Sequence, residues 1–283
     1  MGLLSGKKGL IFGVANDHSL AWAISERLLA EGADLGFNHL PGEKMERRVR
    51  KLAEPAGAKL ITPCDVQKDE DIQRVFEEAR GIYGTLDFVL HSIAWAPLED
   101  IRCPYVESSR KGFLEAMNVS VYSLVAVTRA AVPLMPDGGA IVTLTYFGGE
   151  KVVPGYNLMG VCKAALDQTV KYLAYDLGEK RIRVNAISSG PVKTLAASAV
   201  GDFDQMLGLH SAVAPLGRNV EREELGKAGL FLLSDLSSAV TGEILHVDSG
   251  YNIMGAPGRA AERMAEHTPA ARSPHRLAPS PAS

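Results

Sequence analysis

The chain has 283 residues, of which 46% are hydrophobic and 22% charged, and its 30 basic and 33 acidic side chains give a formal net charge of −3. This length fits one large α/β domain or two small ones. The near-neutral charge, without a basic block, excludes nucleic acid as the main partner and gives no reason to expect binding to an anionic membrane surface.

The cysteines Cys64, Cys103 and Cys162 are few, odd in number and far apart. This usage is typical of reduced thiols in a cytosolic protein rather than of disulfides or a metal site. The N-terminal segment lacks the apolar stretch of a signal peptide, and no segment approaches the roughly 18 to 20 apolar residues of a membrane span. We therefore expect a cytoplasmic protein that binds no metal and no membrane.

Short runs rich in Val, Ile and Leu alternate with longer amphipathic segments along the chain. The first four predicted pairs of strand and helix are 9–15 with 19–32, 33–40 with 43–54, 58–66 with 69–84, and 86–94 with about 107–132. The alternation continues with a strand over 139–146, a helix over about 157–177, a strand over 181–190, a weaker helical region and a strand over 242–250. Such alternation predicts βαβ units in a parallel sheet.

No linker interrupts this pattern before residue 255. We therefore predict an α/β fold for residues 1–255, namely a single-domain, Rossmann-like, doubly wound parallel sheet of about seven strands with helices on both faces. The segment 256–283 is rich in proline and poor in large apolar residues. It cannot bury enough apolar surface to offset its ordering entropy, so we predict a disordered C-terminal tail.

The turn after the first strand has one glycine, Gly13, where a dinucleotide fold usually has a G-x-G-x-x-G sequence. Gly13 lets the chain leave the strand. Ser19 lies at the helix start, either as a plain N-cap or as a hydroxyl beside free amides that hold a phosphate. Asp17 is a carboxylate close to that position, and we expect it to point to solvent or to cap the helix.

Other strand ends carry residues that suit a nucleotide. After the third strand, Asp65 can accept a hydrogen bond from an adenine amino group and Val66 can cover the ring; after the fourth strand, the small residues of 91–94 let a flat ring approach. The sixth strand ends in a Gly-Pro bend followed by Thr194. Because the carboxyl ends of parallel strands share one edge, these residues predict a dinucleotide site.

The end of the second strand bears on the choice of nicotinamide cofactor. An Asp or Glu there would hold the ribose 2′-hydroxyl and an Arg would favour a 2′-phosphate, and neither is present. His39, Lys44 and Arg47 lie near enough to leave NADPH open. Without a committed basic pair, we predict NADH.

Tyr156 and Lys163 show the chemical spacing most indicative of catalysis. They lie seven residues apart, close to two helical turns, which places both on one helix face. A nearby ammonium favours the ionised form of a phenol, and the small and apolar neighbours of Lys163 indicate burial. Tyr146, at the end of the preceding strand, can reach the same edge. We therefore predict a catalytic Tyr156 and Lys163, with Tyr146 beside them.

Together these features resemble the short-chain dehydrogenase/reductase superfamily, and more narrowly its type I enoyl-[acyl-carrier-protein] reductases. The resemblance spans about residues 3–255. It rests on the Gly13 turn with Ser19, on Tyr146, Tyr156 and Lys163, and on four short segments. These segments are "CDV" at 64–66, "HSIAWAP" at 91–97, "RVNAIS" at 183–188 and "GPVKTLAAS" at 190–198.

The resemblance implies that NADH delivers hydride to the β-carbon of a trans-2-enoyl thioester carried by acyl carrier protein or coenzyme A. It implies that Tyr156 hydrogen-bonds the enolate oxygen, that Lys163 holds the nicotinamide ribose, and that Tyr146 shapes the acyl site. It places Ala96 at the substrate mouth and suggests a homotetramer. The implied cofactor contacts are Gly13, Ser19, Leu20, Leu40, Asp65, Val66, Ile93, Lys163, Val192 and Thr194.

Three departures from the family's pattern stand out. Ala94 occupies a position beside the nicotinamide that is usually glycine in relatives, and its methyl group is expected to narrow the space used by diaryl-ether inhibitors and to reduce sensitivity to them. Leu40 occupies a position near the adenine that is often polar in relatives, so its contact is expected to be packing. The segment 194–209 resembles the family's mobile flap, but residues 201–205 read Gly-Asp-Phe-Asp-Gln where relatives tend to have basic residues. Acidic carrier protein therefore docks through other basic residues, docks weakly, or gives way to a coenzyme A substrate.

Two other functions compete with enoyl reduction. A 3-oxoacyl or other carbonyl reductase on the same fold usually has a Ser about thirteen residues before the Tyr, where this chain has Thr143. A noncatalytic nucleotide-binding regulator is the second alternative, because a fold alone does not establish activity. The retention of Tyr156 and Lys163 argues against the regulator.

Overall fold

The computed structural model describes residues 2–192, 203–258 and 261. Within them the chain forms a parallel sheet with the strand order β3-β2-β1-β4-β5-β6-β7. The strands are β1 (Lys8–Phe12), β2 (Asp34–His39), β3 (Ile61–Pro63), β4 (Phe88–His91), β5 (Gly139–Thr145), β6 (Ile182–Ser189) and β7 (Ile244–Val247). The predicted sheet of about seven parallel strands is confirmed, in a doubly wound order.

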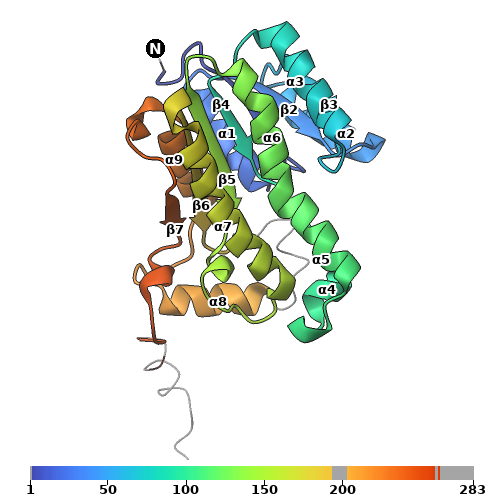
Figure 1. Cartoon of the computed structure of the whole chain (residues 1–283). Helices are drawn as coiled ribbons and strands as arrows, with labels where there is room; N and C mark the ends of the chain where they lie inside the picture. The colour runs from blue at the N-terminus through green and yellow to red at the C-terminus, as the bar shows by residue number, and fades with distance from the viewer. Residues whose placement is uncertain (1, 193–202, 259–260, 262–283) are drawn as a thin grey trace, which may run out of the picture.

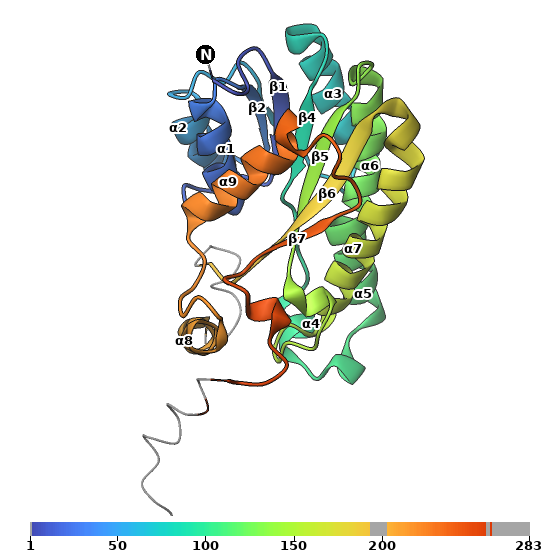
Figure 2. The same cartoon turned by 90° about the vertical axis from the view of Figure 1, so that its left-hand side faces the viewer.

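Helices cover both faces of the sheet (Figure 1), because consecutive side chains of a buried strand point to opposite sides and each side needs a cover. One face carries α1 (Leu20–Ala30), α2 (Glu43–Ala53) and α9 (Arg222–Leu233). The other carries α3 (Asp69–Tyr83), α5 (Arg110–Met117), α6 (Ser123–Ala131) and α7 (Asn157–Leu177). Figure 2 shows the two layers on opposite sides of the strands.

One helical stretch, Arg110–Leu134, is long and apolar enough by composition to cross a membrane, although 56% of its most apolar window is buried inside the protein. It comprises α5, a π-helical turn η2 (Asn118–Tyr122), α6 and a 3-10 turn η3 (Val132–Leu134). Leu124 and Val127 lie fully buried in the core beneath the sheet. The stretch is therefore a core helix, at the place where a helix over about 107–132 was predicted.

The third strand is shorter than the predicted segment 58–66, since β3 has three residues. It lies at the edge of the sheet and pairs only with β2 among the described strands. The Cys64 N–H still donates to the His39 carbonyl oxygen of β2 at 2.8 Å, directly after the last paired residue, Pro63. Asp65 and Val66 lie in the loop that follows.

The carboxyl ends of the strands meet α4 (Leu98–Arg102), the start of α7 and α8 (Phe203–Val213), which lie together at one end of the molecule (Figure 1). The Asn157 side chain ties α7 to α4 by donating to the carbonyl oxygens of Ile101 and Cys103, at 2.8 and 2.7 Å. The short 3-10 turns elsewhere are η1 (Tyr105–Glu107), η4 (Phe147–Gly149), η5 (Gly178–Lys180), η7 (Asp235–Ser237) and η8 (Tyr251–Ile253).

The weaker helical region predicted before the last strand contains α8 and α9. A reciprocal capping box of Glu221 and Glu224 fixes the start of α9. Most of the predicted tail, 259–260 and 262–283, lies outside the described residues. The predicted boundary at residue 255 therefore stays a prediction.

Candidate active site

Gly13 begins the turn that leads from β1 to α1. Its φ is +100°, and a Cβ at this position would lie 1.9 Å from the carbonyl oxygen of Ser92, which follows β4. Both the backbone conformation and the close approach of the neighbouring strand end require glycine. A single glycine is therefore sufficient to open this turn without a G-x-G-x-x-G sequence.

Ser19 precedes α1, as predicted, but its hydroxyl does not cap the helix amides. Ser19 Oγ instead accepts hydrogen bonds from the backbone N–H groups of Ala15 and Asn16, both at 3.0 Å. The amides of Leu20 and Ala21 donate to no acceptor within the described ranges 2–192 and 203–258. Ser19 thus shapes the turn and leaves two N–H groups at a helix N-terminus, an arrangement that attracts phosphate.

Asp17 points to solvent, one of the two outcomes expected for it, with 66% of its side chain exposed. The neighbouring Asn16 takes the local capping role, because its Oδ1 accepts from the His18 N–H at 3.0 Å. The Asp17 carbonyl oxygen accepts from the Arg222 guanidinium of α9. The Asp17 carboxylate therefore does not occupy the free amides of α1.

The ends of β2 and β3 supply apolar surface at the same edge of the sheet. Leu40 is 60% exposed, whereas Val66 is almost fully buried. The Asp65 carboxylate accepts from the Gln67 N–H at 3.1 Å and lies 3.7 Å from the Lys68 ammonium. Leu40 can therefore pack on a planar ring, as expected from its apolar character, while the Asp65 carboxylate is already partly engaged.

The segment after β4 is held by Ser120 of the π-helical turn. Ser120 Oγ accepts from the Trp95 N–H and donates to the Trp95 carbonyl oxygen, both at 2.8 Å. Ile93 is half-buried against the core, and Ala96 is only 7% exposed. Ala96 was predicted to lie at the substrate mouth, but its side chain exposes little surface with which to contact a substrate.

Tyr146 and Tyr156 lie together at the carboxyl end of β5. Their ring centroids are 4.8 Å apart, with an edge-on angle of 70°. Burial raises the pKa of Tyr146 to about 12 and also raises that of Tyr156. Tyr156 is the residue before α7 rather than part of the helix, since α7 begins at Asn157, whose φ is +37°. Both hydroxyls are protonated at neutral pH, which makes them hydrogen-bond donors.

Lys163 lies two turns into α7 with its side chain buried, as its neighbours predicted. Its Nζ donates to the Leu144 carbonyl oxygen at 2.8 Å. Burial lowers the Lys163 pKa to about 8, while the Asp167 carboxylate acts in the opposite direction. The predicted effect of Lys163 on the phenol is not found, because burial and then Tyr146, Cys162 and Asp167 set the Tyr156 pKa.

Asp167 is a residue of this cluster that the motif search did not single out. It follows Lys163 by one helical turn and is 8% exposed. Burial raises its pKa to about 6, opposed by the Thr145 hydroxyl and the Lys163 charge. A Cβ at Gly149 would lie 2.9 Å from Asp167 Oδ2, so the loop after Tyr146 packs directly on this carboxylate. The spacing of four residues from Lys163 was the available signal.

The Thr143 hydroxyl is hydrogen-bonded to a buried histidine, His91. His91 Nδ1 lies 3.0 Å from Thr143 Oγ1, and His91 Nε2 lies 2.8 Å from Ser123 Oγ. Burial lowers the His91 pKa to about 3, with the Lys163 charge acting in the same direction, so the ring is neutral. Thr143 is fully buried. Its hydroxyl is therefore engaged inside the protein and is not free to bind a substrate as a catalytic serine would.

After β6, Val192 is partly buried and packs on the α1 and α9 face. Thr194 and the first part of the predicted flap, 194–202, lie outside the described residues. The remaining part, 203–209, forms most of α8. Met206 of this helix accepts a hydrogen bond from Tyr146 through its Sδ at 3.9 Å. The flap helix thus reaches the tyrosine pair.

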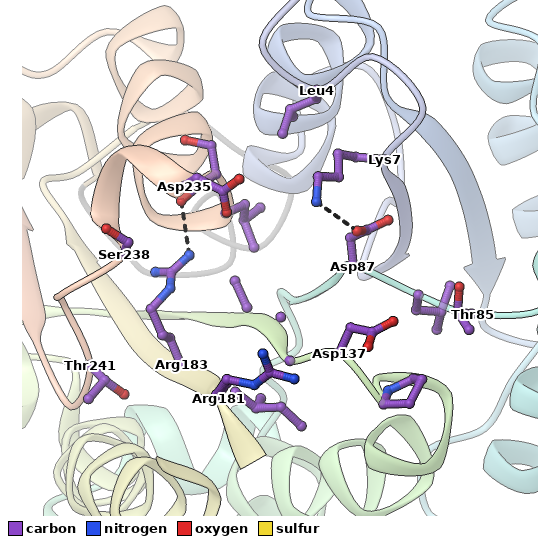
Figure 3. Close-up of a pocket in the computed structure, with 18 of the residues that line it drawn as sticks. Leu4, Lys7, Thr85, Asp87, Asp137, Arg181, Arg183, Asp235, Ser238 and Thr241 are labelled. Carbon is purple, nitrogen blue, oxygen red and sulfur yellow. Dashed lines mark hydrogen bonds and ion pairs between the residues drawn. The ribbon is translucent and has the colours of Figure 1, made fainter. Parts of the chain in front are cut away.

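A cavity of about 570 Å³ lies at the opposite, amino end of the strands (Figure 3). Lys7 Nζ pairs with Asp87 Oδ1 at 3.0 Å, and Arg183 donates to Ser237 Oγ and to the carbonyl oxygens of Leu232 and Ser234, at 2.6, 3.0 and 2.9 Å. The charged groups of Lys7, Asp87 and Arg183 therefore already have partners within the chain. None of the predicted site residues lines it.

Comparison with known proteins agrees with the site at the carboxyl edge. A family model described as enoyl-(acyl carrier protein) reductase matches residues 13–252. The NADH-dependent enoyl-[acyl-carrier-protein] reductase FabI of Rickettsia felis is 51% identical over 254 residues, covering 90% of this chain and 97% of that protein. The corresponding protein of Aquifex aeolicus is 49% identical over 93% of this chain and 97% of its own length.

Solved structures give the same result. The enoyl-(acyl-carrier-protein) reductase of Anaplasma phagocytophilum in complex with NAD is 48% identical, with a TM-score of 0.87 over 90% of this chain and 97% of that one. The Bacillus cereus enoyl-acyl carrier protein reductase with NADP+ and indole naphthyridinone is 50% identical, with a TM-score of 0.88 over 90% and 100% of the two chains.

Proposed function

This chain belongs to the enoyl-(acyl-carrier-protein) reductase family, and we propose that Tyr146, Tyr156 and Lys163 reduce in it the double bond of a trans-2-enoyl thioester. The protein is an NADH-dependent oxidoreductase. The observation that carries the assignment of residues is the pair of partly buried, edge-packed tyrosines beside a buried lysine, at the same sheet edge as the Gly13 turn.

The reaction needs one hydride and one proton. NADH supplies the hydride, which bonds to the β-carbon; the π electrons move onto the thioester oxygen, and a proton from solvent completes the α-carbon. The chain must stabilise the negative charge on that oxygen. Because burial raises the Tyr156 pKa, its O–H stays protonated and donates a hydrogen bond to the oxyanion.

Lys163 has donors to spare for the cofactor. An ammonium has three N–H donors, and Lys163 uses one on the Leu144 carbonyl oxygen, at 2.8 Å. With a pKa of about 8, it is mostly charged at neutral pH. We assign the other two donors to the nicotinamide ribose hydroxyls. Fixing the ribose this way would hold the reduced ring at the edge where the tyrosines lie.

The other cofactor contacts fit the same edge. The free amides of Leu20 and Ala21 suit the pyrophosphate, Gly13 lets the turn that carries them pack against the Ser92 carbonyl oxygen, and Leu40 offers exposed apolar surface to the adenine. Ser19 would act through the turn that it holds, and Asp65, Val66, Ile93 and Val192 would line the adenine and nicotinamide ends. The end of β2 has no arginine to bind a 2′-phosphate. The preference for NADH over NADPH follows from this absence.

The substrate thioester is carried by acyl carrier protein, and coenzyme A is the alternative carrier. The described start of the flap helix has Asp204 and Gln205 rather than basic residues. Docking of an acidic carrier protein therefore depends on basic residues outside this helix. A comparison of kcat/KM for the same acyl chain on the two carriers, at low and high salt, separates these routes, because only carrier-protein docking should weaken strongly with salt.

We propose a cytoplasmic homotetramer in which the outer faces of the long helices form interfaces. Tyr172 and Tyr175 of α7 are 66% and 85% exposed, an unusual exposure for two aromatic residues one turn apart. Sedimentation velocity of the wild type against a Tyr172→Lys, Tyr175→Lys double variant tests this. A tetramer that dissociates in the variant supports the proposal, and a monomeric wild type overturns it.

The decisive test of the activity uses a trans-2-enoyl thioester and a 3-ketoacyl thioester of equal length, with NADH and with NADPH. We expect oxidation of NADH with the enoyl substrate only. The occupied Thr143 already disfavours the carbonyl reductase, which needs a free hydroxyl at that position. Turnover of the ketone alone would overturn the assignment, and turnover of neither would favour a nucleotide-binding regulator.

A further inference from the structure

His210 lies on the inner side of α8 and joins this helix to the end of the sheet. It is 4% exposed, and its ring stacks on Tyr251 of η8 with centroids 4.4 Å apart and an angle of 16°. A buried histidine in face-to-face contact with an aromatic ring fixes the position of its helix. None of the sequence motifs pointed to this residue.

The hydrogen bonds around His210 define its tautomer. Asn219 Nδ2 donates to the Leu207 carbonyl oxygen at 3.1 Å, which orients the amide so that its Oδ1 faces His210 Nδ1 at 3.0 Å. An amide oxygen can only accept, so Nδ1 carries the proton. His210 Nε2 is then a bare acceptor that is buried without a partner in the part of the chain that the structure describes.

The same contacts lead back to the catalytic tyrosines. The Tyr251 ring meets the Phe147 ring edge-on at 5.8 Å, and Phe147 directly follows Tyr146. Tyr146 in turn donates to Met206 Sδ, and Met206 lies one helical turn before His210 on α8. α8 is therefore attached to the tyrosine loop at two points, directly through Met206 and indirectly through the His210–Tyr251 stack.

The surroundings of His210 favour its neutral form. Burial lowers its pKa below the ordinary 6.5, while the Asp248 carboxylate opposes this. Asp248 is itself engaged, since it accepts from the N–H groups of Gly250 and Asn252 at 2.9 and 2.8 Å. Among the described residues, Tyr251 is the other titratable group in contact with the ring. Protonation would create a buried Nε2–H donor without an acceptor among the described residues, which only displacement of α8 could hydrate.

We propose that neutral His210 is a positioning residue that docks α8 against the tyrosine pair and thereby sets the affinity for the acyl part of the substrate. This inference deepens the proposed function, because α8 covers the site where the enoyl chain would lie. It assigns no role to His210 in hydride or proton transfer. Its removal should therefore raise KM for the thioester without a matching loss of kcat or of NADH affinity.

Steady-state kinetics of His210→Ala, His210→Phe and Ser211→Ala over about pH 5.5 to 8 test the proposal. Ser211 is the control, because its hydroxyl bonds only the Gly208 carbonyl oxygen at 3.0 Å on the outer side of α8. We expect His210→Ala to raise the thioester KM about tenfold near pH 8, where His210 of the wild type is neutral, through loss of the stack and one hydrogen bond, with kcat and the NADH KM within about twofold of the wild type.

The pH dependence gives the readout that a purely structural role would not move. In the wild type, the thioester KM should rise at the acid end of this range, where His210, whose pKa burial lowers below the ordinary value, takes up a proton. His210→Phe keeps an aromatic ring on Tyr251 but cannot protonate, so its KM should stay flat over the acid range. A wild-type thioester KM without an acid rise, an equal acid rise in His210→Phe, or an equal loss of NADH affinity in His210→Ala, would overturn the proposal.

Hydrogen exchange separates this inference from the enzymatic assignment. The amides of α8 should exchange faster in His210→Ala than in the wild type or in Ser211→Ala, with α1 and α7 unchanged. This result together with no enoyl turnover by the wild type would refute the proposed function and leave the docking role of His210 standing. Unchanged exchange in α8 would refute the docking role itself.

Discussion

At the amino ends of the strands, Lys7 pairs with Asp87 at 3.0 Å, and Arg183 donates hydrogen bonds to three acceptors. At the carboxyl ends, by contrast, the buried Lys163 donates to a single carbonyl oxygen, and two amides at the start of α1 have no acceptor among the described residues. Both ends contain lysines, carboxylates and backbone amides. They differ in how far these groups are satisfied within the chain. Charge that the fold has already paired serves stability, and charge left under-paired in a buried place is available to a ligand.

The under-paired end lowers the stability of the fold at neutral pH. The Lys163 pKa falls from 10.5 to about 8, so the unfolded chain binds the additional proton and stability is lost as the pH falls from 10.5 to 8. The Asp167 pKa rises from 3.8 to about 6, so stability is lost as the pH rises through this interval. At pH 7 both groups are charged and buried, which a fold without a function there would avoid.

The largest effect is expected from Tyr156→Phe, which removes the O–H assigned to the oxyanion. We expect kcat to fall by about 10²- to 10³-fold, the loss found for a single oxyanion donor. The free energy of unfolding should change by about 1 kcal/mol or less, because the ring and its contact with Tyr146 remain. Tyr175→Phe, on the exposed face of the following helix α7, is the control. A comparable fall of kcat in Tyr175→Phe would show that the loss is not specific to the Tyr156 hydroxyl.

Gly13→Ala should produce the next largest effect, on the cofactor. Two costs add at this position: a φ of +100° and a Cβ 1.9 Å from the Ser92 carbonyl oxygen. Gly57→Ala isolates the first cost, because Gly57 has a φ of +80° with nothing within 4 Å of an added Cβ. We expect Gly57→Ala to lower stability by about 1 to 2 kcal/mol without affecting NADH.

In Gly13→Ala, the steric overlap should in addition displace the turn and raise the NADH dissociation constant by at least about tenfold, measured by quenching or enhancement of nicotinamide fluorescence. Equal stability and equal NADH affinity in the two variants would mean that the turn relieves the overlap with Ser92 without weakening NADH binding. The carboxyl edge would then not depend on the geometry of its first turn.

The fold was largely predictable because its signals are local. The alternation of apolar runs and amphipathic segments placed all seven strands, and the helix predicted over 157–177 is α7 itself. Gly13 was identifiable since only glycine adopts its backbone conformation readily. The tyrosines and Lys163 were identifiable by spacing. In each case a short stretch of sequence carries the physical reason.

The remaining features depend on contacts between distant segments. Ser19 bonds the turn before it instead of the helix after it, and β3, at the sheet edge, pairs with β2 over three residues only. The tautomer and the ring position of His210 depend on Asn219 and Tyr251, which belong to two other segments. The electrostatics of Tyr156 depend on burial, which spacing does not reveal.

Asp167→Asn should shift the pH profile while preserving the fold. Removing the carboxylate removes the group that raises the Lys163 pKa, so the lysine should lose its proton at lower pH. We expect the basic limb of kcat/KM, near pH 8 in the wild type, to move by about one pH unit toward acid. Gln168→Ala, the exposed neighbour on α7, is the control. An unmoved basic limb would show that Asp167 does not act on Lys163.

The smallest effect is expected from the same substitution at the other end of the sheet. Asp87→Asn removes the partner of Lys7 but keeps an oxygen for the Lys8 N–H, which lies 2.8 Å from Asp87 Oδ2. Both side chains of the pair are about one-third or more exposed, so the loss of unfolding free energy should be about 1 kcal/mol or less, measured by urea titration.

The sign of this loss is fixed by Lys7. The hydrogen bond that Lys7 donates to Asp87 raises the Lys7 pKa above 10.5, so the pair stabilises the fold at neutral pH and ceases to do so as the pH rises through the raised pKa. The kinetic profile of Asp87→Asn should coincide with that of the wild type. If its basic limb moved as far as in Asp167→Asn, the profile would report net charge instead of the Lys163 environment, and the difference between the two ends would have no functional meaning.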